Sequence, residues 1–158
     1  MSVLFQKILV PLDGSEHSLK ALDEAAQIAK MSPGKITLLS VYSVSAQPIM
    51  MPEQSASGYI GRPILTGDEI SRLTEDARKF GNRILDDGEQ RINALGVEAE
   101  KRLVEGHVVQ QIVQIANEGN FDLIVIGARG ISHIREMLLG SVTDGVIHHA
   151  RCAVLVIK

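Results

Sequence analysis

The 158 residues of this chain suffice for one domain that needs no disulfide or metal, because such a chain buries roughly 70% of its unfolded surface. The net charge of −3 and the aromatic content of 3% argue against nucleic-acid binding, which needs a basic surface and often stacking aromatic rings. Cys152 is the single cysteine, which rules out a disulfide within the chain and favours a reducing compartment.

The N-terminus does not have the pattern of a secretory signal, and no apolar run approaches the ~20 residues that span a bilayer. We therefore expect a cytoplasmic protein that binds neither membranes nor nucleic acid.

Five short apolar runs, rich in β-branched residues, alternate with segments of helical periodicity. The runs lie at 7–10, 36–41, 97–104, 123–126 and 153–157. Apolar residues recur at helical spacing over 19–29, 70–95 and 108–116, and Gly119 is placed to cap the last of these helices. Gly81 and Gly88 lie inside the second helical segment, where each costs roughly 1 kcal/mol relative to alanine.

This alternation predicts an α/β fold, with residues 1–158 forming a single domain around a doubly wound, five-stranded parallel sheet that has helices on both faces. Nearly continuous apolar runs indicate strands covered on both faces, whereas the alternating run at 97–104 indicates a half-exposed edge strand. Residues 43–66 are rich in Ser, Pro and Gly and predict a long flexible loop, which could be a lid, a partner-binding insertion or a disordered segment.

A glycine pattern follows the fourth apolar run. Gly127, Gly130, Gly140 and Ser141 give the spacing G-x2-G-x9-G-S. Glycine lets the backbone approach a ligand closely, successive N–H groups can bind an anion, and the free N–H groups of a helix that opens at Gly140 favour a phosphate. The hydroxyls of Ser141 and Thr143 could add donors.

Two other strand ends are expected beside this pattern, because the carboxyl ends of parallel strands meet at one edge of the sheet. Pro11, Leu12 and Asp13 follow the first run, and Val41 ends the second. The three strand ends together predict a ligand crevice.

These residues resemble the ATP-binding subgroup of the universal stress protein family, and the resemblance extends over the whole chain. It rests on four pieces in order, namely residues 10–15 (VPLDGS), residues 121–127 (FDLIVIG), the G-x2-G-x9-G-S spacing and residues 152–157 (CAVLVI). The resemblance implies a Rossmann-like fold of the adenine nucleotide alpha hydrolase type. It also implies a homodimer that pairs through the last strand, Ala153–Ile157.

The resemblance further implies roles for individual residues. Asp13 would face the adenine or ribose, the Val41 backbone would contact adenine, and the glycine pattern would hold the ribose and phosphates. Arg129 could reach a phosphate or remain solvated. The expected nucleotide-binding residues are Pro11, Leu12, Asp13, Val41, Gly127, Arg129, Gly130, Gly140, Ser141, Val142 and Thr143.

Simpler readings of several of these residues remain open. Asp13 could be the N-cap of the first helix, in a capping-box spacing with Glu16, and Gly127 and Gly130 could be turn residues. We interpret His148 and His149 as a cationic helix end rather than a metal site. Cys152 is expected to be an inert thiol just before a buried strand.

The predicted function is a nucleotide-dependent sensor or regulator in the stress response that binds ATP, or ADP or AMP, with Mg²⁺ carried only by the phosphates. No G-x4-G-K-S/T loop is present, and we predict no catalytic residue and no protein metal site. One alternative is a slow ATPase that acts as a switch, with Asp13 or Asp144 holding Mg²⁺. Another is a dimeric interaction module without a physiological nucleotide.

Overall fold

Strands and helices alternate throughout the computed structural model, which describes residues 4–43, 66–131 and 139–158. The strands are β1 (Lys7–Pro11), β2 (Lys35–Tyr42), β3 (Ala99–Glu105), β4 (Leu123–Gly127) and β5 (Ala153–Ile157). The helices are α1 (Glu16–Met31), α2 (Gly67–Ala94), α3 (Val108–Glu118) and α4 (Ser141–His149). The predicted order of elements is confirmed.

The five strands form one parallel sheet in the order β3-β2-β1-β4-β5. The predicted edge strand is therefore correct, although β3 begins at Ala99 because the backbone N–H of Val97 still donates to Ile92 at the end of α2. Strands β2 and β3 are added on one side of β1, and strands β4 and β5 then follow on its other side. Ligands of such sheets bind at the carboxyl ends of the strands where the order reverses, here between β1 and β4.

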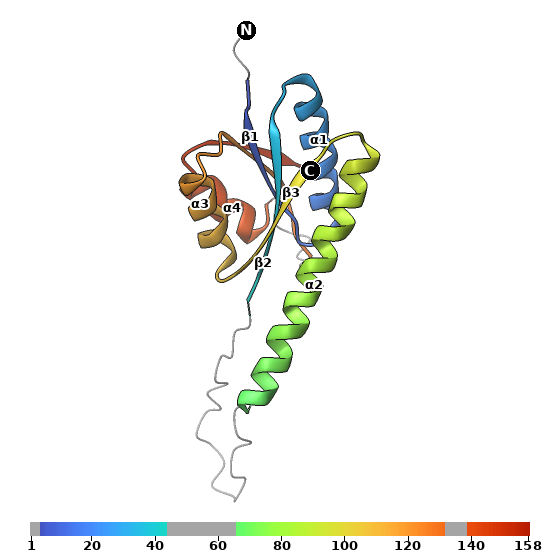
Figure 1. Ribbon diagram of the computed structural model, residues 1–158. Coiled ribbons are helices and arrows are strands. Elements are labelled where there is room, and N and C mark those ends of the chain that lie inside the picture. Colours follow the sequence, from blue (N-terminus) through green and yellow to red (C-terminus); the bar gives the residue numbers. More distant parts are fainter. Residues whose placement is uncertain (1–3, 44–65, 132–138) are drawn as a thin grey trace, which may run out of the picture.

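Helices cover both faces of the sheet, as the doubly wound prediction requires (Figure 1). One aliphatic cluster packs α1 and α2 against one face and contains Ile8, Leu22, Leu38, Leu85 and Val125. The other packs α3 and α4 against the opposite face and includes Leu39, Ile112, Ile124 and Val146. Alternate side chains of the central strands enter opposite clusters, which is why these strands are continuously apolar.

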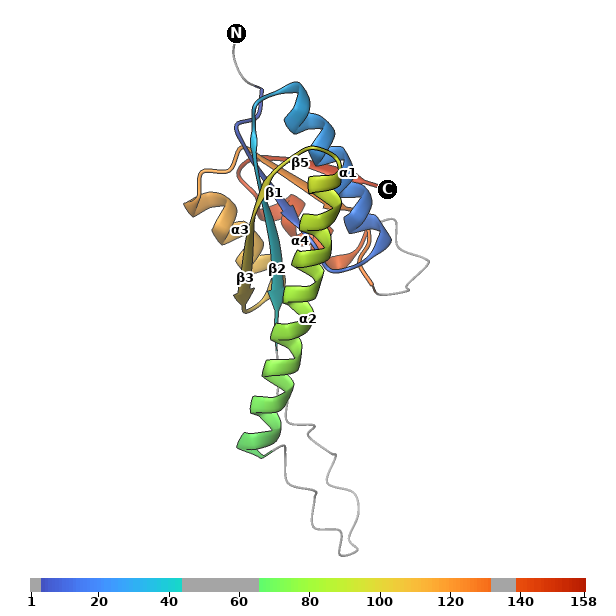
Figure 2. The same ribbon diagram turned by 45° about the vertical axis from the view of Figure 1, so that its right-hand side comes forward.

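Helix α2 runs unbroken for 28 residues, although two glycines lie within it. A Cβ atom at Gly81 would lie 2.6 Å from Leu103 Cδ1, and one at Gly88 would lie 2.6 Å from Leu12 Cδ1. The glycines therefore allow the helix to pack closely on the sheet. Helix α2 is about 42 Å long at 1.5 Å per residue, and its N-terminal part projects beyond the sheet (Figures 1 and 2).

A capping box between Thr66 and Glu69 closes the projecting end of α2. The predicted loop at 43–66 lies outside the described residues except for Ser43 and Thr66. Within the described residues, no helix combines the length and apolar character that crossing a bilayer requires.

Candidate functional site

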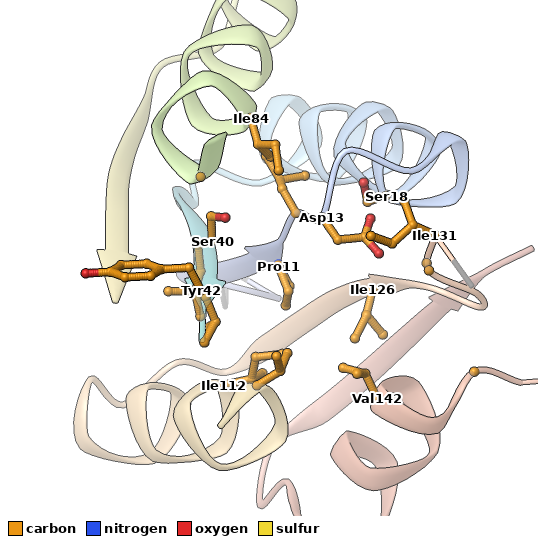
Figure 3. Close-up of a pocket in the computed structure, with 18 of the residues that line it drawn as sticks. Pro11, Asp13, Ser18, Ser40, Tyr42, Ile84, Ile112, Ile126, Ile131 and Val142 are labelled. Atoms are coloured by element: carbon orange, nitrogen blue, oxygen red, sulfur yellow. The ribbon is translucent and has the colours of Figure 1, made fainter. Parts of the chain in front are cut away.

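A cavity of about 400 Å³ lies at the carboxyl ends of β1, β2 and β4, with α2 on one side and α3 and α4 on the other (Figure 3). We call it the strand-end cavity. Its volume falls in the range of roughly 300–1,000 Å³ that is typical of small-molecule sites. All the predicted nucleotide-binding residues line it, namely Pro11, Leu12, Asp13, Val41, Gly127, Arg129, Gly130, Gly140, Ser141, Val142 and Thr143. The fold thus brings together residues from four separate parts of the sequence.

Asp13 is not the N-cap of α1, which rules out that alternative interpretation. Ser15 caps the helix, because its Oγ accepts the backbone N–H of Ser18 at 3.2 Å. Asp13 Oδ1 instead accepts the N–H of Ser15 at 2.9 Å, which fixes the carboxylate just ahead of the helix. Asp13 is half-buried and keeps its second oxygen, Oδ2, on the side of Gly130.

At two positions of the motif, a different neighbouring group leaves no room for a side chain larger than that of glycine. A Cβ atom at Gly127 would lie 2.7 Å from the backbone carbonyl carbon of His17, so this glycine allows α1 to pack against the end of β4. A Cβ atom at Gly130 would lie 2.6 Å from Asp13 Oδ2, so this glycine leaves room for the carboxylate. Both are more than turn residues, since an added methyl group would displace a specific neighbour in each case.

Two hydrogen bonds join the halves of the glycine motif. The Gly140 N–H donates to the Ala128 carbonyl at 2.7 Å, and the Thr143 hydroxyl donates to the Gly127 carbonyl at 2.7 Å. The Thr143 hydroxyl is therefore not free to donate to a phosphate, contrary to our expectation. Its place in the site is structural, because it holds the start of α4 against the end of β4.

Backbone donors at the start of α4 have no acceptor within the helix. The first hydrogen bond within the helix runs from the Asp144 N–H to the Gly140 carbonyl at 3.0 Å. The N–H groups of Ser141, Val142 and Thr143 precede it and have no acceptor within the helix, and the helix dipole adds a partial positive charge there. This end of the cavity can bind an anion.

Charged side chains in the cavity wall are few. Among the described residues that line it, Asp13 and Arg129 carry charge, and Arg129 is half-buried next to the start of α4. We call the region of Arg129, Gly130 and the first turn of α4 the phosphate end. In the part of the chain that the structure describes, no three His, Cys, Asp or Glu side chains gather where they could hold a metal ion.

The opposite end of the cavity is mostly apolar, and the sequence did not single out its residues as a site. It is formed by β2 and by the facing sides of α2 and α3, and its residues include Ser40, Tyr42, Phe80, Gly81, Ile84, Val108 and Ile112. We call this region the base end. The helical periodicity had placed Phe80, Ile84 and Ile112 on inward faces, but it could not show that those faces border a cavity. Ile112 is buried, whereas Phe80 is 50% exposed.

Three features outside the cavity also bear on the predictions. His148 and His149 lie in the last turn of α4, where each Nδ1 is 2.8 Å from the carbonyl oxygen four residues earlier, as expected for a helix end. Cys152 is half-buried, and burial raises the pKa of its thiol. Strand β5 is not buried as expected: it forms a sheet edge, so Ala153 and Leu155 are exposed.

Known proteins match this chain along almost its whole length. The model of the universal stress protein family matches residues 4–158. Universal stress protein YxiE of Bacillus subtilis (strain 168) is 34% identical over 155 residues, which cover 98% of this chain and 100% of the relative.

Solved structures agree with the family match. Universal stress protein UspA from Lactobacillus plantarum superposes with a TM-score of 0.80 at 26% identity and covers 98% of both chains. A universal stress protein solved in complex with cAMP gives a TM-score of 0.68 at 32% identity, covering 99% of each chain.

Proposed function

The chain belongs to the universal stress protein family, and from that premise we propose that it binds an adenine nucleotide, ATP above all, in the strand-end cavity. One observation carries the proposal: the residues that the sequence predicted to bind a nucleotide come from four separate segments, and all of them line this cavity. The relative that is 32% identical was solved with cAMP, which is also an adenine nucleotide.

The chemistry of the two ends supports one orientation of the ligand. Arg129 and the free N–H groups at the start of α4 favour phosphates at the phosphate end. The apolar walls from α2 and α3 suit a planar purine at the base end. Asp13 lines the cavity beside Gly130, where its carboxylate can accept hydrogen bonds from ribose hydroxyls.

We propose that the nucleotide is sensed rather than consumed, in a cytoplasmic protein that regulates a response to stress. The phosphate end has no lysine of the P-loop type, and the Thr143 hydroxyl is committed to Gly127. Any Mg²⁺ would arrive on the phosphates. Turnover by the isolated chain should therefore be slow.

We also propose a homodimer that pairs through β5. This edge strand is apolar, and its unpaired side would otherwise invite non-specific pairing. A two-fold axis beside β5 would extend the sheet across both copies.

The first test is to purify the protein under native conditions, denature it and identify any released nucleotide by chromatography and mass spectrometry. ATP in the released fraction would support sensing, and ADP would favour the slow ATPase. The second test measures thermal stability with ATP, AMP, cAMP and GTP, since a ligand at about 100 times its dissociation constant stabilises by about 2.7 kcal/mol.

A matched pair of variants makes the thermal test specific. Gly140 and Gly67 are both at the start of a helix, and a Cβ atom would have no contact closer than 3.5 Å at Gly140 and none within 4 Å at Gly67. Gly140→Val should reduce the ATP-dependent shift because its methyl groups crowd the phosphate end, whereas Gly67→Val should keep it. If ATP changes the melting temperature of neither wild type nor Gly140→Val, the result would favour the interaction module without a nucleotide.

A further inference from the structure

Three buried hydroxyl side chains, those of Ser18, Ser40 and Thr143, form part of the wall of the strand-end cavity. The Ser18 hydroxyl donates to the Ser15 carbonyl at 2.9 Å, and the Thr143 hydroxyl donates to the Gly127 carbonyl. Ser40 differs, because its hydroxyl takes part in none of the hydrogen bonds among the described residues, although Ser40 is only 3% exposed. The residue as a whole is buried, but its Oγ is not among the fully enclosed side-chain atoms that lack a partner, so this hydroxyl borders the cavity and is available to a ligand.

Ser40 has apolar neighbours and borders the cavity. Ser40 lies on β2 opposite Leu103 of β3, and Figure 3 shows it at the base end on the same side of the cavity as Ile84. Gly81 of α2 lies overhead, where an added Cβ atom would be 3.5 Å from Ser40 Oγ. A ligand that fills the cavity would exclude water from this hydroxyl, so a ligand with a polar group in reach of Ser40 is favoured over one that leaves the hydroxyl unpaired.

We propose that the Ser40 hydroxyl hydrogen-bonds the polar edge of the nucleobase and is a specificity-determining contact of the site. The inference rests on the proposed function, since it requires the base to lie at the base end and the phosphates at the phosphate end. A serine hydroxyl both donates and accepts, so it can pair with a ring nitrogen or an exocyclic amino group. A ligand that lacks a base has no group that reaches Ser40.

The test compares three ligands that contain different parts of the nucleotide. Calorimetry with ATP, adenosine and tripolyphosphate is carried out on wild type, on Ser40→Ala and on Ser40→Cys, which keeps the side-chain shape, is slightly larger and forms only weak hydrogen bonds. Ser32→Ala is the control, because Ser32 is also buried but its hydroxyl donates to the Phe5 carbonyl near the other end of β2. Thermal unfolding without nucleotide shows which variants are folded.

Both Ser40 variants should bind ATP and adenosine about fivefold more weakly than wild type, as expected for one lost neutral hydrogen bond, and should bind tripolyphosphate with unchanged affinity. Ser32→Ala should keep wild-type affinity for ATP and adenosine. Unchanged ATP and adenosine affinity in both Ser40 variants would overturn the inference alone, as would an equal loss for tripolyphosphate. Failure of wild type to bind ATP at all would overturn the proposed function and this inference with it.

Discussion

The carboxylate of Asp13 occupies the space beside Gly130 that a side chain at Gly130 would need, since Asp13 Oδ2 lies 2.6 Å from the position of that Cβ atom. We predict that Gly130→Ala displaces the carboxylate and weakens ATP binding about tenfold or more, with little loss of stability because Gly130 is exposed. Calorimetry measures the affinity, and Gly67→Ala is the control.

A double variant separates displacement from a direct effect of the methyl group. If the methyl group acts by pushing Asp13 aside, Gly130→Ala should cost much less affinity in an Asp13→Ala background than in wild type. Strictly additive losses would contradict a coupling between the two residues.

Gly127→Ala should act on folding, in contrast to Gly130→Ala. The new Cβ atom would lie 2.7 Å from the carbonyl carbon and 2.9 Å from the carbonyl oxygen of His17, and these backbone atoms cannot rotate away. Helix α1 would have to shift, which overpacking data put at about 1–3 kcal/mol. Urea unfolding measures the loss, and an unchanged midpoint would show that α1 and β4 are packed less tightly than described.

Thr143 should prove to be a stabilising residue. Thr143→Val removes the donor to Gly127 and leaves a buried carbonyl without it, so the free energy of unfolding should fall by about 1–3 kcal/mol. Thr143→Ser keeps the hydroxyl and should lose less. Chemical denaturation of both variants checks this order, and a larger loss in Thr143→Ser would contradict the role of the hydrogen bond.

Cys152 should make stability depend on pH in the alkaline range. Burial raises the pKa of this thiol above its ordinary value of 9.0, so the unfolded chain ionises first as the pH rises. The contribution of the neutral Cys152 thiol to the free energy of unfolding is complete below about pH 9. It declines as the pH rises through the pKa that this thiol has in the folded protein. Cys152→Ala should flatten the fall in unfolding midpoint above pH 9, and an equally steep fall in the variant would assign that fall to other groups.

The proposed dimer can be tested at Leu155, an exposed apolar side chain of β5 that is 37% exposed. Leu155→Arg places a charge in the proposed interface and should shift the mass measured by light scattering toward one chain. Leu73→Arg is the control, because Leu73 is also exposed but lies on the projecting part of α2. A monomeric wild type, or a dimer that both variants keep, would contradict pairing through β5.

The sequence predicted the sheet well because burial on two faces makes central strands such as Leu123–Gly127 continuously apolar. The capping residue of α1 could not be decided in advance, because Asp13 and Ser15 both suit a helix start and only the contact between Ser15 and the Ser18 N–H distinguishes them. The expected dimer placed β5 at a sheet edge, but the exposure of Ala153 and Leu155 was missed, because an apolar edge strand has the same sequence pattern as a buried strand.

The phosphate end of the candidate site could be predicted, because its glycines have a recognisable spacing. The base end could not, because it consists mostly of apolar side chains that line a cavity. Periodicity placed Phe80 and Ile84 on an inward face of α2 but cannot tell a packed core from a cavity. The partner of the Thr143 hydroxyl, and the lack of one for the Ser40 hydroxyl among the described residues, depend on contacts between distant segments. These contacts exist only in the folded chain.

The central claim is that the strand-end cavity binds an adenine nucleotide, and calorimetric titration of ATP into nucleotide-free protein tests it most directly. We predict saturable binding of one nucleotide per chain that is weakened by Gly140→Val and retained by Gly67→Val. The absence of binding at millimolar ATP, with no increase in thermal stability of the wild-type chain, would contradict the claim.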